Sequence, residues 1–163
     1  MKYKDSYGYI NSIYPPYDGM VFKPWIYLVP HKRPKSVLML GYAGGTVAGL
    51  IRLIYGNVPI TGVDIEIIDN VYHANLVRMD ARDYVKTCGK YEFVLVDLFK
   101  DGEYNEVDFL TDTEFAGNLK RISDYLTIHI TSQRDMSVFK GMDLRTITLG
   151  SHTFYYYSQY YLK

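Results

Sequence analysis

The sequence predicts a single α/β domain with a mostly parallel sheet, helices on both faces and an antiparallel hairpin at one edge. Short apolar runs recur along the chain, and helical patterns separate them. Three of these runs close on an aspartate, at Asp64, Asp80 and Asp97. Uninterrupted apolar runs are typical of strands that are buried on both faces of a parallel sheet. The chain has 163 residues, a usual length for one domain.

The first strand, loop and helix are the clearest of the expected elements. An apolar run from Val37 to Leu40 precedes a glycine-rich loop. From Thr46 to Tyr55, apolar residues recur at helical spacing until Gly56 ends the pattern. The same reasoning predicts further strands over residues 60–63, 76–79, 93–96 and 126–130, and further helices over 81–87, over 112–124 and near 134–140.

The two ends of the chain differ from this regular core. Residues 1–34 hold five prolines and many aromatic residues without clean periodicity, so we expect an irregular segment with at most short strands or one turn of helix. The core is expected over residues 35–163. Thr111 is the expected N-cap of the helix over 112–124, with Glu114 completing a capping box. Residues 144–149 and 153–161 are expected to form the edge hairpin around Gly150.

The composition favours a small-molecule role. Eighteen Lys and Arg balance eighteen Asp and Glu, so no overall field attracts nucleic acid or an anionic membrane. A lone Cys88 and the lack of a long apolar run predict a soluble, cytoplasmic protein. The four histidines show no metal-ligand spacing, so no metal is expected. Eighteen tyrosines and the edge hairpin favour a homodimer.

The glycine-rich loop is the first candidate for a binding site. It reads Gly41, Tyr42, Ala43, Gly44 and Gly45, and glycine allows a ligand to approach the main chain closely. The dinucleotide pattern G-x-G-x-x-G is absent because position 43 is alanine.

An acidic partner follows the loop along the chain. Asp64, 23 residues beyond Gly41, would accept hydrogen bonds from two ribose hydroxyls, and Glu66 is the alternative. The order of loop and acidic residue predicts a nucleoside site.

Five segments together resemble the spermidine synthases. They are SVLMLGYAGGTVAGLIR, ITGVDIE, NLVRMDARDYV, YEFVLVDLF and FLTDTEFAGNLKRI, and they span roughly residues 36–130. The resemblance implies a Rossmann-like methyltransferase fold that binds S-adenosylmethionine or its decarboxylated form. It implies cofactor contacts from the loop and from the Asp64–Ile65 segment, adenine binding by Asp80 and Ala81, and a place for Asp97 at the reacting centre.

The sequence departs from that family in three ways. Residues 1–34, before the core, can supply only a fragment of the family's separate β-rich region. Lys100 stands where the family has a second carboxylate after Asp97. Only 15 residues separate Asp64 from Asp80, too few for a full helix and a strand, so we expect the helix between them to be lost or reduced to a turn.

Three functions remain open at this point. The first is transfer from S-adenosylmethionine to an unidentified small or cationic acceptor, with Asp97 catalytic. Four carboxylates follow Asp97 in the loop over residues 101–108, and Asp101 with Asp97 would help bind a cationic substrate. The second is aminopropyl transfer to a diamine. The third is a non-catalytic binding or assembly module on the same fold.

Overall fold

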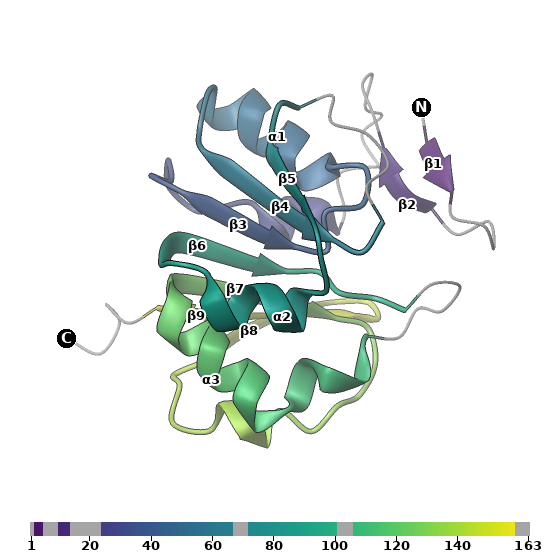
Figure 1. Cartoon of the computed structure of the whole chain (residues 1–163). Coiled ribbons are helices and arrows are strands. Elements are labelled where there is room, and N and C mark those ends of the chain that lie inside the picture. Colours follow the sequence, from purple (N-terminus) through teal and green to yellow (C-terminus); the bar gives the residue numbers. More distant parts are fainter. Residues whose placement is uncertain (1, 5–9, 14–23, 67–71, 101–105, 159–163) are drawn as a thin grey trace.

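A seven-stranded sheet forms the centre of the molecule (Figure 1). The computed structural model describes residues 2–4, 10–13, 24–66, 72–100 and 106–158. In spatial order the sheet reads β5-β4-β3-β6-β7-β9-β8. Its strands are β3 (Val37–Leu40), β4 (Ile60–Asp64), β5 (Asn75–Arg78), β6 (Tyr91–Val96), β7 (Ser123–Ile130), β8 (Arg145–Leu149) and β9 (His152–Ser158).

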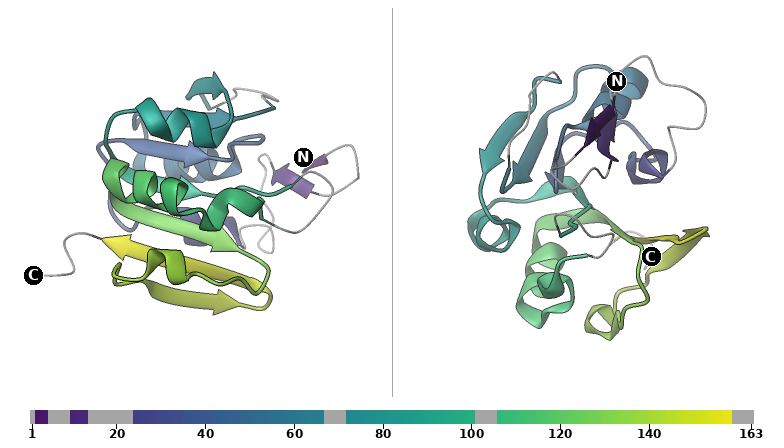
Figure 2. Two further views of the ribbon diagram at one scale, coloured as in Figure 1. Left: turned by 60° about the horizontal axis from the view of Figure 1, so that its bottom comes forward. Right: turned by 90° about the vertical axis from the view of Figure 1, so that its right-hand side faces the viewer.

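The first five strands of the sheet are parallel, and the last two are antiparallel. β3 pairs in parallel with both β4 and β6, while β9 runs antiparallel to β7 and to β8. Figure 2 shows the yellow-green hairpin of β8 and β9 at one edge of the sheet. The expected fold class, including the edge hairpin, is therefore confirmed.

Helices cover both faces of the sheet because β3 is apolar on both sides. Leu38 and Leu40 pack with α2 (Ala81–Thr87) and α3 (Thr113–Ile122), together with the short 3-10 helices η2 (Asp108–Thr111) and η3 (Ser137–Phe139). Val37 and Met39 point the opposite way, as successive side chains of a strand do, and pack with α1 (Thr46–Tyr55) and η1 (Trp25–Leu28).

The N-terminal segment holds little regular structure in its described part. β1 (Lys2–Lys4) and β2 (Ile10–Ile13) form a separate antiparallel pair, and η1 is one turn of 3-10 helix. Residues 65–74 join the parallel strands β4 and β5, and their described part contains no helix. Arg52 on α1 fastens this connection, since its Nε donates to the carbonyl of Tyr72 at 3.1 Å.

Three local predictions are wrong. Thr111 lies inside η2, and α3 is preceded by Asp112, whose side chain makes no capping bond. The helix expected near 134–140 is the three-residue η3. The helix expected to reach residue 124 ends at Ile122, because Ser123 already pairs with Tyr91 of β6 in the parallel sheet. Residues 159–161 of the expected last strand lie outside the described residues.

Candidate cofactor-binding and active site

The loop and the three aspartates meet along one edge of the sheet. Backbone hydrogen bonds fix their order: Met79 donates to Asp64 at 3.0 Å, Gly41 to Val63 at 2.9 Å, and Asp97 to Leu40 at 2.9 Å. All lie at the carboxyl ends of parallel strands, where open α/β sheets bind ligands. The order along the edge is Asp80, Asp64, the glycine loop and Asp97.

Gly41 is required by the close approach of two strand ends. Its φ is +85°, and a Cβ at this position would lie 2.1 Å from the carbonyl oxygen of Asp97. No side chain fits there, so the loop and the segment that carries Asp97 are in direct backbone contact. This contact joins the expected cofactor loop to the expected reacting centre.

Tyr42 points into the protein rather than into the edge of the sheet. Its ring is buried against β4 and α1, and a Cβ on Gly62 or Gly45 would overlap it at 2.3 and 2.5 Å. The two glycines therefore make room for the ring. Only the main-chain atoms of Tyr42 are therefore placed to contact a ligand.

Asp64 is held rigidly beside the loop. One carboxylate oxygen accepts the N–H of Ala43 at 2.8 Å, and the other accepts the N–H of Glu66 at 3.1 Å. Ala43 itself has a φ of +46°, and the bond to Asp64 holds the loop in that turn. Burial raises the pKa of Asp64 above its ordinary value, although the backbone N–H groups that point at the carboxylate oppose the shift.

Asp80 and Ala81 lie where β5 gives way to α2. Asp80 caps the helix by accepting the N–H of Arg82 at 2.8 Å, and it also pairs with the Arg82 guanidinium, whose hydrogen bond lowers the pKa of Asp80. Ala81 is buried. Two apolar side chains near this turn are exposed to solvent: Ile65 is 62% exposed and Met79 is 42% exposed.

Asp97 belongs to a chain of hydrogen bonds that the sequence did not reveal. Its Oδ1 lies 2.7 Å from Nδ1 of His129 on β7, and Nε2 of His129 lies 2.9 Å from Nδ1 of His152 at the start of β9. In the sequence, Asp97 and His152 lie 55 positions apart. The sequence signal for this cluster is that each of the three residues lies at or next to the end of a predicted strand.

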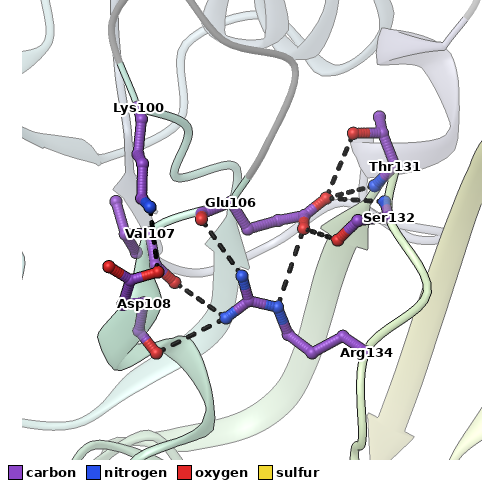
Figure 3. Close-up of polar contacts among 7 residues, drawn as sticks. All are labelled: Lys100, Glu106, Val107, Asp108, Thr131, Ser132 and Arg134. Atoms are coloured by element: carbon purple, nitrogen blue, oxygen red, sulfur yellow. Dashed lines mark hydrogen bonds and ion pairs between the residues drawn. The ribbon is translucent and has the colours of Figure 1, made fainter.

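The two described carboxylates of the acidic loop after Asp97, Glu106 and Asp108, are held in ion pairs (Figure 3). Glu106 is fully buried, and it accepts bonds from the backbone and hydroxyl groups of Thr131 and Ser132. Its Oε2 lies 3.7 Å from Nε of Arg134. Burial alone would raise the pKa of Glu106, but the hydrogen bonds, led by that of Ser132, outweigh it and lower the pKa.

Asp108 is the other carboxylate of this loop that the structure describes. Lys100 pairs with Asp108 at 2.9 Å. The predicted substrate contact Asp101 lies outside the described residues, and so does Glu103. Half of the four carboxylates are therefore already paired with cations of the chain itself.

The described residues contain neither a candidate metal cluster nor a membrane-spanning helix. Within ranges 24–66, 72–100 and 106–158, no cluster of three or more His, Cys, Asp or Glu side chains is placed to hold a metal ion. In the part of the chain that the structure describes, every helix is too short or too polar to cross a membrane.

Comparison with known proteins supports both the fold and the predicted resemblance. No protein-family profile matches the sequence. A polyamine aminopropyltransferase from Vibrio vulnificus is 28% identical, over 66% of this chain and 42% of that protein. The chain thus spans less than half the length of this curated relative.

Solved structures of methyltransferases share the fold. Human methyltransferase-like protein 13, in complex with SAH, superimposes with a TM-score of 0.62 and 14% identity, over 77% of this chain and 72% of that one. A protein from Corynebacterium glutamicum, described as a probable spermidine synthase, gives a TM-score of 0.63 and 15% identity, over 77% and 56% of the two chains. The Rossmann-like methyltransferase fold is therefore established.

Proposed function

We propose that the protein is an S-adenosylmethionine-dependent transferase that acts on a small or cationic acceptor. The observation that carries the proposal is the carboxylate of Asp64, fixed on the N–H of Ala43 at 2.8 Å beside the glycine loop. Each carboxylate oxygen there has lone pairs left for ribose hydroxyls. The family resemblance and the shared fold support the same assignment.

The residues along the sheet edge suit the parts of an adenosyl ligand. Gly44 carries no side chain, so a ligand can approach the main chain of the loop there, while Gly41 and Gly45 make room for Asp97 and Tyr42. The exposed apolar side chains of Ile65 and Met79 would pack on the faces of the adenine ring. Asp80 and the main chain of Ala81 would bind the polar edge of adenine.

Asp97 is the proposed catalytic residue. S-adenosylmethionine supplies an activated carbon on a sulfonium sulfur, so the protein contributes mainly alignment and removal of a proton. Asp97 lies next to the glycine loop through its contact with Gly41, and its carboxylate would attract a cationic group. No metal is required by this scheme.

Aminopropyl transfer to a diamine is the second candidate. The Vibrio vulnificus relative favours it. Lys100 weighs against it, because a cation that pairs with Asp108 replaces the second carboxylate expected for diamine binding. The third candidate, a non-catalytic module, is favoured by Ala43 in the loop and by the short connection between Asp64 and Asp80.

Product analysis separates the three candidates. The purified protein is incubated with S-adenosylmethionine or its decarboxylated form, each with putrescine and with a panel of other amines, and the products are identified by mass. Methylated products support the first candidate, and spermidine supports the second. Absence of product together with absence of donor binding supports the third. The same products are measured for Asp97→Asn, which should lose activity, and for its matched control Arg145→Ala, on the exposed edge strand β8, which should keep it.

The cellular setting follows from the same proposal. A transferase that uses a soluble cofactor and a small substrate fits the cytoplasm and has no need of nucleic acid or membrane. β8 is an edge strand with exposed side chains, so it offers a surface for a homodimer. Sedimentation of the wild type and of a proline variant in β8 tests that part of the proposal.

A further inference from the structure

We propose that Asp97, His129 and His152 form a proton relay whose outer end, Nε2 of His152, accepts the proton released by the acceptor nucleophile. This inference rests on the proposed transferase function. It changes one role in that function: Asp97 acts through His129, and the proton is accepted by a base on β9, a strand that lies outside the segments carrying the family resemblance.

With the Asp97 carboxylate ionised and both imidazole rings neutral, the two hydrogen bonds assign the ring protons. A carboxylate only accepts hydrogen bonds, so Nδ1 of His129, 2.7 Å from Asp97 Oδ1, carries a proton and donates it. Nε2 of the neutral His129 ring then has a lone pair, and it accepts from Nδ1 of His152 at 2.9 Å. Nε2 of His152 is left with a lone pair. The chain therefore ends in a basic nitrogen.

The middle member of the relay is held still and kept dry. His129 is 5% exposed, and its ring stacks on Phe154 with centroids 4.5 Å apart and an interplanar angle of 9°. Phe99 covers it at 5.2 Å. His129 thus exchanges protons with its two partners rather than with water. His152 is only half-buried, so the relay opens to the surface at this residue.

The relay opens on the same edge of the sheet as the proposed cofactor site. β7 runs parallel to β6, so His129 lies at the carboxyl end that also carries Asp97. β9 runs antiparallel to β7, so its first residue, His152, lies at this edge too. Phe154 and His129 share the face of the sheet that carries α1 and the glycine loop.

Burial and the neighbouring groups favour the neutral form of His152, which a base requires. Burial is the main cause that lowers the pKa of His152, the neighbouring His129 lowers it further, and Asp97 opposes the shift. β8, the other strand beside it, places Leu149 opposite His152. Glu106, which binds Thr131 beyond the end of β7, is neutralised by Arg134. His152 is therefore neutral near pH 7 and free to accept a proton.

The chemical step balances with these groups. The lone pair of an acceptor amine forms a bond to the donor carbon, and the carbon–sulfur bond breaks with its electron pair moving to the sulfonium sulfur. The proton leaves nitrogen for Nε2 of His152. The resulting imidazolium donates to His129 through Nδ1, and the carboxylate of Asp97 stabilises the positive charge along the chain. The acceptor is therefore a nucleophile with a proton to lose, an amine or a hydroxyl rather than a thiolate.

Histidine NMR of the 163-residue chain tests the relay without any ligand. Long-range nitrogen–proton spectra are recorded for the wild type, for Asp97→Asn and for the control His31→Gln, whose ring lies among Phe93 and Tyr125 away from the relay. We expect His129 and His152 to carry their protons on Nδ1, and His152 to titrate at Nε2 below pH 6.5. Asp97→Asn should lower this pKa further and disturb both tautomers, and His31→Gln should change neither.

Kinetics with the active donor and acceptor tests the proton transfer. His152→Gln should lower kcat by about 10²-fold or more, leave the donor Kd unchanged and remove the acid limb of the pH profile, and added imidazole should restore part of the rate. A proton on Nε2 of His152 in the wild type, or a normal pH profile in His152→Gln, would overturn the relay. Intact tautomers without donor binding would instead overturn the proposed transferase and the transfer step with it.

Discussion

Replacing Gly41 by alanine measures how closely the cofactor loop approaches the segment that carries Asp97. Gly41 has a φ of +85°, which costs an L-residue about 1–2 kcal/mol. The new Cβ would also lie 2.1 Å from the carbonyl oxygen of Asp97, which must move. Strain of this kind in a packed interior costs about 1–3 kcal/mol. We therefore expect Gly41→Ala to lower the free energy of unfolding by about 2–5 kcal/mol.

Gly141 provides the matched control for this variant. Its φ is +90°, and a Cβ there would have nothing within 4 Å, so Gly141→Ala isolates the backbone cost of about 1–2 kcal/mol. Urea unfolding of both variants and the wild type gives the comparison. Equal losses for Gly41→Ala and Gly141→Ala would refute the claim that the loop contacts the end of β6. A larger loss for Gly41→Ala, together with weaker donor binding, is the predicted result.

Three further variants test the site and its supports. Glu106→Gln removes a buried charge paired with Arg134 and should cost about 3–5 kcal/mol in urea at pH 7. Because folding lowers the pKa of Glu106, its carboxylate contributes stability at a pH above 4.5, the pKa of the unfolded state, and this stability is lost as the pH falls through the folded-state pKa. The free energies of unfolding of the variant and the wild type should therefore converge in acid. The pKa of Asp64 is raised, so donor affinity should fall as the carboxylate protonates on acidification, and calorimetry should find no such pH dependence in Asp64→Asn. Tyr42→Ala empties the space beside Gly62 and should cost about 3–5 kcal/mol in a thermal or urea transition.

The regular part of the fold could be predicted because local pattern and tertiary role agree there. Val37–Leu40 is apolar on both sides and is indeed buried on both sides, between the two helical layers. The helix Thr46–Tyr55 has the predicted bounds. The errors fall where tertiary contacts decide, as at Ser123, which joins the sheet in place of α3.

The candidate site could be predicted only where it is local in sequence. The loop and Asp64 are read from spacing after a strand, and the hydrogen bond from Ala43 to Asp64 is consistent with that interpretation. The pairing of Asp97 with His129 and His152 depends on which strands become neighbours, since β9 inserts between β7 and β8. Likewise, the acidic sequence around Glu106 did not reveal that Arg134 would neutralise it.

Calorimetric titration with S-adenosylmethionine and with its decarboxylated form tests the central claim most directly. The wild type, Asp64→Ala and the control Glu66→Ala are compared at pH 7.5, because Glu66 contributes only its backbone N–H to Asp64. The account predicts saturable binding of at least one donor to the wild type and to Glu66→Ala, and loss of about tenfold or more in affinity in Asp64→Ala. Binding of neither donor to the folded wild-type protein, or equal affinity in Asp64→Ala, would contradict it.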